Sequence, residues 1–331
     1  MTETKVTTKS IVGRAKDTAI YSATKFLFDR LPVKAAAYAL QRPAKSVMGS
    51  LLCRQWRHLN NYNTEYPVPE LNGRARWVVE VPNRQPTDPV VVYLHGGGYV
   101  LGILGGQIDL CAELHKYLKN PRLSIVVLDY SLGPEHNYPT PLVEASKLYY
   151  QLTEVDKSTN VILMGDSAGG NLAINICRHI YDPHPDAKKL PSKVAPSGAI
   201  LISPWVNLTP EKVGTYSTAV NDCLTFNIGT NWGTAYCPDA EARASSWVSQ
   251  VKAKDVPFSK YLPKNTLLIT GEDEGLYDDD IAFAKMASID NVHVEKNGKH
   301  DSVVYELPQV VEGDILANTS FTTTLDFLHR F

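Results

Sequence analysis

Short runs of β-branched and other apolar residues alternate with longer segments of helical spacing from Arg74 to the end of the chain. The apolar runs predict strands at 75–81, 90–94, 124–130, 160–165, 198–203, 266–270 and 291–296. The helical spacing predicts helices near 107–119 and 141–155, and a last one around 322–329. Strands that alternate with helices of this length form parallel sheets covered by helices on both faces. We therefore expect an open, mostly parallel α/β sheet.

Two regions do not fit this alternation. Residues 1–66 show helical spacing, and residues 206–257 are rich in polar and aromatic residues but lack strand signals. We expect them to form a helical cap over the ligand edge of the sheet, with a core made of 67–205 and 258–331. For the aromatic residues of these regions, a place in the core is the first interpretation and a place in the pocket wall is the second. They are Trp56, Tyr62, Tyr66, Tyr216, Phe226, Trp232 and Tyr236.

Charge and cysteine content exclude several kinds of partner. The 33 Lys and Arg and 35 Asp and Glu are scattered and give a net charge of −2, so nucleic acid is not expected as a partner. Five cysteines without a C-x-x-C pair indicate neither a disulfide framework nor a zinc site, and they suit a reducing compartment. The sequence shows no signal peptide core or membrane span, which predicts a cytoplasmic protein.

An apolar stripe at helical spacing lies near the N-terminus and ends before Pro32. Its members are Ala19, Ile20, Ala23, Phe26, Leu27 and Leu31. Such a stripe usually packs on the protein itself, and peripheral contact with a membrane surface is the alternative. A homodimer is a candidate assembly that the sequence does not test.

The segment Gly165–Gly169 reads Gly-Asp-Ser-Ala-Gly between an apolar strand and an amphipathic helix. In this pattern the turn is so sharp that its central residue has strained backbone and its neighbours must be small. Ser167 would stand exposed at the end of the strand and at the N-terminus of a helix, where free N–H groups favour negative charge. The pattern predicts Ser167 as a nucleophile and Asp166 as a structural hydrogen-bonding residue. A plain glycine-rich turn is the alternative.

Three consecutive glycines follow His95 at the end of an earlier predicted strand. Glycine weakens regular structure, so a triple indicates either a tight turn or a close approach to the backbone. A serine that attacks an acyl carbonyl creates an oxyanion, which backbone N–H groups stabilise. We expect the N–H groups of Gly97, Gly98 and Ala168 to form this oxyanion hole. His95 would fix the loop, and Tyr99 would cover one wall of the site.

The acid and base partners of Ser167 are expected later in the chain, near the ends of later strands, in the order acid and then histidine. Four acids compete after the strand at 266–270: Glu272, Asp273, Glu274 and Asp278. Most acids in such a run are solvated, and we expect one to be buried. His293 lies in a predicted strand and His329 in the final helix, whereas His300 follows a turn after the last strand. His300 is therefore the predicted base.

Together these features resemble the hormone-sensitive lipase family of α/β-hydrolases. Four ordered motifs carry the resemblance: HGGGY (His95–Tyr99), DYSLGPEHNYP (Asp129–Pro139), GDSAGG (Gly165–Gly170) and ISPWVNL (Ile202–Leu208). The resemblance implies an α/β-hydrolase fold with a helical cap. It also implies Glu274 as the triad acid and Asp278 as a later acid of the motif. The family usually has aspartate at the first position, so Asp273 stays an alternative.

The surroundings of the base depart from the family. The usual His-Gly-Phe is missing, since the chain reads Gly-Lys-His-Asp-Ser-Val around His300. This variation is similar to fungal members that resemble steryl acetyl hydrolases.

The implied chemistry is that of a serine hydrolase of the carboxylesterase or lipase-like type. It would cleave short-acyl esters of an apolar alcohol through an acyl-enzyme, with Ser167, His300 and Glu274 as the triad, and would need no metal and no organic cofactor. The same triad could act as an amidase, a lactonase or an arylformamidase. The alternative of another class is a ligand-binding homologue without catalysis, against which the presence of both Ser167 and His300 argues.

Overall fold

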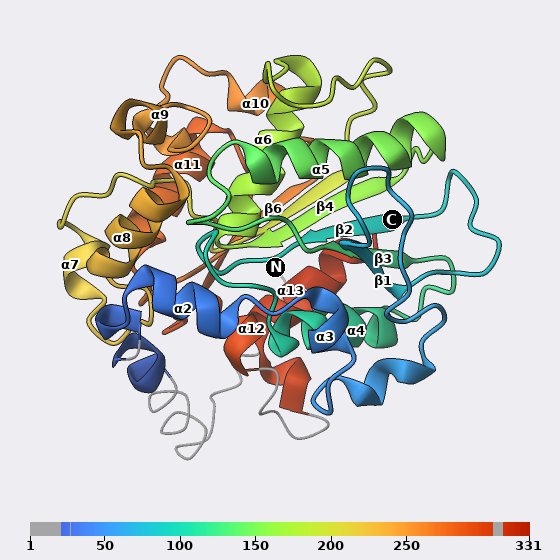
Figure 1. The fold of residues 1–331 in the computed structure, drawn as a ribbon, viewed down its shortest axis with the longest axis horizontal. Coiled ribbons are helices and arrows are strands. Elements are labelled where there is room, and N and C mark those ends of the chain that lie inside the picture. The colour runs from blue at the N-terminus through green and yellow to red at the C-terminus, as the bar shows by residue number, and fades with distance from the viewer. Residues whose placement is uncertain (1–20, 27, 307–313) are drawn as a thin grey trace, which may run out of the picture.

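A seven-stranded sheet forms the centre of the computed structural model, which describes residues 21–26, 28–306 and 314–331 (Figure 1). The strands are β1 (Ala75–Val79), β2 (Val90–Leu94), β3 (Ser124–Leu128), β4 (Val161–Asp166), β5 (Gly198–Ile202), β6 (Thr266–Gly271) and β7 (Asn291–Glu295). They lie in the order β1-β3-β2-β4-β5-β6-β7, with β1 antiparallel to β3 and all other neighbours parallel. The predicted, mostly parallel sheet is confirmed.

The central strands are continuous apolar runs because both faces of the sheet are covered. In β2, Val90, Val92 and Leu94 belong to one hydrophobic cluster, whereas Val91 and Tyr93 belong to the other. This division follows from the alternation of side chains along a strand. The sheet therefore has a hydrophobic core on each face.

Helices from different parts of the chain cover the two faces. The first face carries α5 (Thr140–Tyr150), α6 (Ala168–Tyr181) and α11 (Tyr277–Met286). The second carries α4 (Gly105–Leu118), α12 (Ser302–Glu306) and α13 (Thr319–Leu328). Figure 1 shows α5 and α6 above the sheet, and α12 and α13 below it. These helices confirm the expected α/β layering.

All three predicted helices differ in their bounds from the sequence prediction. Helix α4 begins two residues before the predicted 107–119 and ends one residue earlier. The helix predicted at 141–155 is α5, which begins one residue earlier and continues directly into a π-helical turn, η2 (Gln151–Val155). The last helix, α13, begins three residues before the predicted start because Asn318 caps it: its side-chain oxygen accepts a hydrogen bond of 2.8 Å from the N–H of Phe321.

Short helices occupy the two regions that the sequence assigns to the cap. The N-terminal region has helical residues at 21–26 and 28–30, followed by α2 (Val33–Leu40), α3 (Ala44–Met48) and η1 (Arg54–His58). The second region has α7 (Thr215–Thr218), α8 (Phe226–Tyr236), α9 (Ala240–Ala244) and η3 (Gln250–Lys252). Two further short helices complete the described chain, α10 (Phe258–Tyr261) and η5 (Asp314–Ala317). Of the predicted apolar stripe, Ala19, Ile20 and Leu27 lie outside the described residues.

The first of these regions divides between the two sides of the molecule. Helix α2 lies beside α8 (Figure 1). In contrast, η1 packs toward α4, where the indole N–H of Trp56 donates a hydrogen bond of 2.6 Å to the carboxylate of Asp109. Of the N-terminal region, the part that includes α2 therefore lies next to the 206–257 region, whereas the part that includes η1 does not. The division into cap and core remains a prediction.

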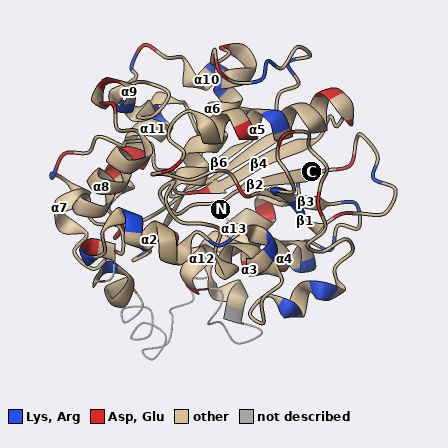
Figure 2. Cartoon of the chain, in the orientation of Figure 1, with Lys and Arg blue, Asp and Glu red and all other residues tan. Residues whose placement is uncertain are grey.

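Figure 2 shows segments of Lys and Arg and segments of Asp and Glu interspersed along the ribbon, with neither sign gathered in one part of it. Across the three described stretches, no helix combines the length and apolar character needed to cross a bilayer. All five cysteines are free and buried.

Candidate active site

Ser167 lies at the turn between β4 and α6, with φ of +50° and ψ of −116°. The positions two residues before and two residues after Ser167 must be glycine for a steric reason. A Cβ at Gly169 would lie 1.9 Å from the carbonyl oxygen of Leu94, and one at Gly165 would lie 2.4 Å from the carbonyl carbon of Gly169. The predicted strand-to-helix elbow is thus present. The expectation of an exposed serine is wrong, because Ser167 is only 4% exposed and is reached through a pocket.

The elbow makes Gly169 a strong test of the packing between β2 and α6. We expect Gly169→Ala to lower the free energy of unfolding by about 3 kcal/mol or more, because backbone of β2 cannot move away from the new methyl group. Urea unfolding followed by circular dichroism measures this change. Gly105→Ala is the matched control, since its Cβ would meet only the Cys53 sulfur at 3.7 Å and should change stability by less than about 1 kcal/mol. Equal stability of the two variants would contradict the packing at the elbow.

His300 follows β7, as the sequence predicts, and reaches across the sheet edge to Ser167. Its Nε2 lies 3.0 Å from Ser167 Oγ, within hydrogen-bond distance, and the imidazole is buried. The competing histidines lie elsewhere: His293 Nε2 contacts the hydroxyl of Thr319 at 3.1 Å, and His329 is exposed near the C-terminus. The structure therefore brings His300, and neither of the other two, to the serine.

Glu274 lies on the far side of the imidazole ring. Its Oε2 is 3.9 Å from His300 Nδ1, and the residue is fully buried. Asp273 is exposed. Asp278, in the first turn of α11, accepts a hydrogen bond of 2.9 Å from the N–H of Thr215. The geometry favours Glu274 over Asp273 as the acid.

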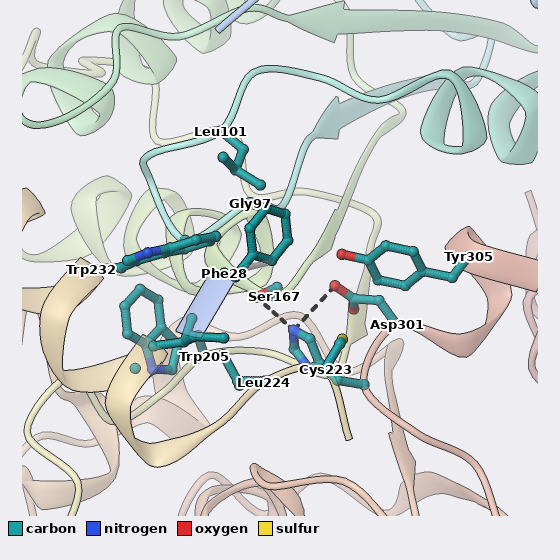
Figure 3. A pocket seen from close by; sticks show the side chains of 14 residues that line it. Phe28, Gly97, Leu101, Ser167, Trp205, Cys223, Leu224, Trp232, Asp301 and Tyr305 are labelled. Carbon is teal, nitrogen blue, oxygen red and sulfur yellow. Dashed lines mark hydrogen bonds and ion pairs between the residues drawn. The ribbon is translucent and has the colours of Figure 1, made fainter. Parts of the chain in front are cut away.

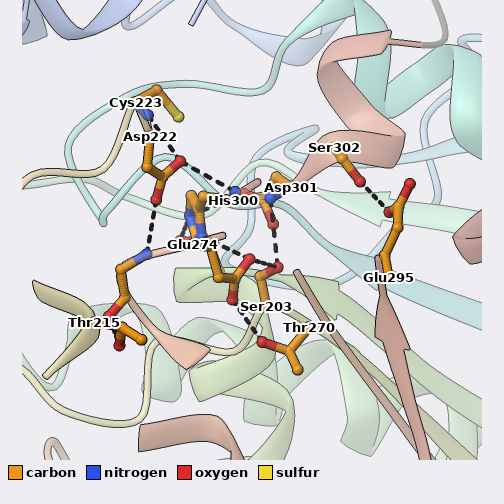
Figure 4. A network of polar contacts seen from close by, with 12 residues as sticks. Ser203, Thr215, Asp222, Cys223, Thr270, Glu274, Glu295, His300, Asp301 and Ser302 are labelled. Carbon is orange, nitrogen blue, oxygen red and sulfur yellow. Dashed lines mark hydrogen bonds and ion pairs between the residues drawn. The ribbon is translucent and has the colours of Figure 1, made fainter. Parts of the chain in front are cut away.

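Hydrogen bonds and burial set the protonation of these groups. The two carboxyl oxygens of Glu274 accept hydrogen bonds from Ser203 Oγ at 2.6 Å and Thr270 Oγ1 at 2.8 Å (Figure 4). Burial, and next the charge of Asp222, raise the pKa of Glu274 to about 7. Burial lowers the pKa of His300 to about 3, so the imidazole is neutral and can accept a proton at Nε2.

Asp222 links the loop that carries Glu274 to the loop that carries His300 (Figure 4). Its Oδ1 accepts hydrogen bonds from the N–H of His300 at 3.1 Å and of Cys223 at 2.8 Å. Its Oδ2 accepts one from the N–H of Gly275 at 2.9 Å, the residue after Glu274. Asp222 therefore fixes both loops through their backbone. It was not predicted, because it lies in a stretch of sequence with no regular pattern.

The glycine loop after β2 faces the same pocket as Ser167. Gly97 and Gly98 have φ of +106° and +59°, conformations that residues with a side chain rarely adopt. Both line the pocket, and Ala168 is the first residue of α6. This places the three predicted oxyanion-hole residues around the serine. Their role remains a proposal.

Asp166 and His95 hold the glycine loop in place through contacts with the protein core. Asp166 Oδ1 accepts a hydrogen bond of 2.9 Å from the N–H of Gly96, and its Oδ2 accepts one of 2.7 Å from Gln107. The His95 ring stacks on Tyr130 with ring centroids 4.2 Å apart. Tyr99 does not line the pocket, contrary to expectation, because its ring stacks on that of Tyr236 at 3.8 Å in the core.

A largely apolar pocket of about 430 Å³, partly open to solvent, leads to Ser167 (Figure 3). Phe28, from the N-terminal helical segment, meets Trp232 of α8 edge to face, with ring centroids 5.2 Å apart. The other apolar walls are Leu101, Trp205, Leu224 and Ile228. Within the described residues, no group of three or more His, Cys, Asp or Glu side chains could hold a metal ion.

A family model described as steryl acetyl hydrolase matches residues 60–313. The chain belongs to the steryl acetyl hydrolase family. It is 27% identical over 248 residues to a putative steryl acetyl hydrolase, mug81, of Schizosaccharomyces pombe, covering 70% of this chain and 63% of that protein. It is 27% identical over 237 residues to steryl acetyl hydrolase 1 of Saccharomyces cerevisiae, covering 65% and 54%. The chain thus spans less than two thirds of the length of these relatives.

Solved structures confirm the α/β-hydrolase fold of this steryl acetyl hydrolase family member. A thermostable esterase from Pseudomonas putida superposes with a TM-score of 0.71 at 21% identity, over 95% of this chain and 97% of that one. An esterase from the archaeon Pyrobaculum calidifontis gives a TM-score of 0.73 at 23% identity, over 98% and 100%. The resemblance to esterases of the hormone-sensitive lipase type, and to its fungal members, is confirmed.

Most pocket walls in this member of the family were not predicted. Of the seven aromatic residues proposed for core or pocket, only Trp232 lines the pocket that contains Ser167. Trp205 lay within a recognised motif, whereas Phe28, Asp301 and Tyr305 carried no local signal. These residues meet only because distant segments converge at the end of the sheet.

Proposed function

We propose that this chain is a serine esterase that removes a short acyl group from an apolar alcohol through an acyl-enzyme. The observation that carries this proposal is the 3.0 Å contact between His300 Nε2 and Ser167 Oγ on a strained elbow inside an apolar pocket. The two steryl acetyl hydrolases of yeasts to which the chain is similar support the same reaction.

Each residue has a role that follows from its position. His300 Nε2 removes the proton of Ser167 as Oγ attacks the ester carbonyl, and Glu274 stabilises the imidazolium across Nδ1. The N–H groups of Gly97, Gly98 and Ala168 stabilise the negative oxygen of the tetrahedral intermediate. His300 then protonates the leaving alcohol, and it activates water to hydrolyse the acyl-enzyme.

The substrate class is inferred from the pocket walls and from the relatives. Side chains of Phe28, Leu224 and Trp232 offer hydrocarbon and aromatic surface rather than charge, which suits an apolar alcohol. The relatives are called steryl acetyl hydrolases, which suits an acetyl group and a sterol. A small-molecule ester is therefore the proposed partner, while the homodimer, peripheral membrane contact and cytoplasmic location remain predictions.

An ester series on the full chain tests this function. We expect hydrolysis of p-nitrophenyl acetate and of a sterol acetate, with kcat/KM falling as the acyl chain lengthens from acetate to octanoate. A fluorophosphonate probe should add covalently to Ser167, as intact mass and peptide mapping would show. A formanilide or a lactone cleaved faster than every ester would reassign the reaction, and a chain that neither turns over nor reacts with the probe would be a binding homologue.

A further inference from the structure

A second carboxyl group lies at the reacting end of His300. Asp301 Oδ2 is 3.2 Å from Nε2, the same nitrogen that contacts Ser167 Oγ at 3.0 Å (Figure 3). Asp301 also lines the pocket, although only 4% of the residue is exposed. The triad thus has one acid beside Nδ1 and another acid beside Nε2, and the mechanism above leaves the second without a role.

We propose that Asp301 is a further catalytic residue, which contacts the oxygen of the leaving alcohol and donates a hydrogen bond to it. This inference rests on the proposed ester hydrolysis.

The place of the leaving oxygen follows from the chemistry of His300. After Ser167 attacks, Nε2 carries the proton and must hand it to the alcohol oxygen, so that oxygen has to lie within hydrogen-bond distance of Nε2. Asp301 Oδ2 already neighbours Nε2, whereas Gly97 and Gly98, which also line the pocket, are the proposed site of the other oxygen of the intermediate. The Asp301 carboxyl is therefore next to the alcohol oxygen when the bond breaks.

The protonation of Asp301 suits this role. Burial, and then the charges of Asp166, Glu274 and Asp222, raise the pKa of Asp301 well above its usual range. A carboxylate here would accept the Nε2 proton and hold it back from the alcohol, whereas a neutral carboxyl is a donor. Among the described residues, Asp301 Oδ1 has no hydrogen-bond partner, so one oxygen of this buried group is unused.

The step balances without another reactant. The bond between the carbonyl carbon and the alcohol oxygen breaks, and its electron pair goes to that oxygen. The proton that His300 took from Ser167 moves from Nε2 to the same oxygen. Asp301 donates a hydrogen bond to the oxygen as charge develops there and keeps its own proton. The contribution of Asp301 to the rate should therefore grow as the alcohol becomes a poorer leaving group.

Leaving-group dependence in Asp301 variants tests the inference. Asp301 has φ of +52°, which glycine and asparagine tolerate, so Asp301→Gly removes the carboxyl and Asp301→Asn keeps its volume and an N–H donor. The substrates are p-nitrophenyl acetate, whose alcohol leaves readily, and cyclohexyl acetate, whose alkoxide needs stabilisation. We expect Asp301→Gly to lower the cyclohexyl-to-nitrophenyl ratio of kcat/KM by about tenfold to a hundredfold, with Asp301→Asn in between.

The other outcomes separate the possible failures. Equal loss on both esters leaves the ratio unchanged and would mean that Asp301 only supports His300. Variants that keep the wild-type rate on both esters would likewise overturn the proposal. Asp273→Asn, which alters an exposed carboxyl on the acid loop, is the control and should keep the wild-type ratio. If the wild-type chain hydrolyses neither ester, the proposed esterase function itself fails. Circular dichroism confirms that each variant is folded, and Asp301→Asn carries the test if the glycine variant is not.

Discussion

Ser167→Ala is expected to lower kcat for p-nitrophenyl acetate by about 10⁴-fold or more. The variant removes the atom proposed to attack the carbonyl, the Oγ that lies 3.0 Å from His300 Nε2. Alanine keeps the Cβ and is small enough for the elbow, so the fold should be retained. Initial rates by absorbance, together with the melting temperature, measure the two effects separately.

A serine elsewhere on the chain provides the control for this prediction. Ser46 is exposed on α3 and does not line the pocket, so Ser46→Ala should keep both the rate and the fluorophosphonate labelling of the wild type. Ser167→Ala should lose the labelling altogether. Wild-type turnover by Ser167→Ala would show that another group attacks the ester and would overturn the proposed mechanism.

The sheet was predictable because its strands are buried on both faces. Runs such as Val90–Leu94 are apolar throughout, and a parallel strand covered by helices requires such a run. The helix ends were less predictable, because they depend on single contacts such as the Asn318 cap on α13. Ser167 and the glycines that follow β2 were predictable for a related reason, because each imposes a steric requirement on residues next to it in the sequence.

The rest of the site depends on contacts between segments that are far apart in sequence. Asp222 holds the backbone of His300 across 78 positions, and Phe28 meets Trp232 although the two lie in separate regions of the chain. A side chain in such a contact needs no local pattern, so the sequence gives no sign of it. The choice of acid needed the structure for the same reason: burial, rather than spacing, separates Glu274 from Asp273.

Glu274→Ala is expected to lower kcat by about 10³-fold, whereas Asp273→Ala should stay within about twofold of wild type. Glu274 is buried beside Nδ1 of His300, and Asp273 is exposed. The loss should be somewhat smaller than that of the nucleophile, because Ser167 and His300 still react without the acid. Steady-state kinetics on p-nitrophenyl acetate compare the two variants, and the reverse order would move the role to Asp273.

The pH dependence of the wild-type chain shows whether Glu274 acts as a carboxylate. The pKa of Glu274 is raised to about 7 by burial, so the carboxyl gains a proton as the pH falls through about 7. A neutral carboxyl no longer stabilises the imidazolium, and kcat should therefore decline below that pH. Burial lowers the pKa of His300 to about 3, well below this range, so we assign the expected decline to Glu274.

Glu274→Gln assigns the decline to a residue. Glutamine is neutral at every pH, so this variant should be slow and its rate should show no step near pH 7. A step that persists in Glu274→Gln would instead point to Asp222, whose pKa burial raises to about 6 and whose carboxyl holds the backbone of His300. The two carboxyls act differently: one stabilises charge on the ring, and the other holds the loop that carries it. A pH profile of the Glu274→Gln variant therefore separates electrostatic support of the base from its positioning.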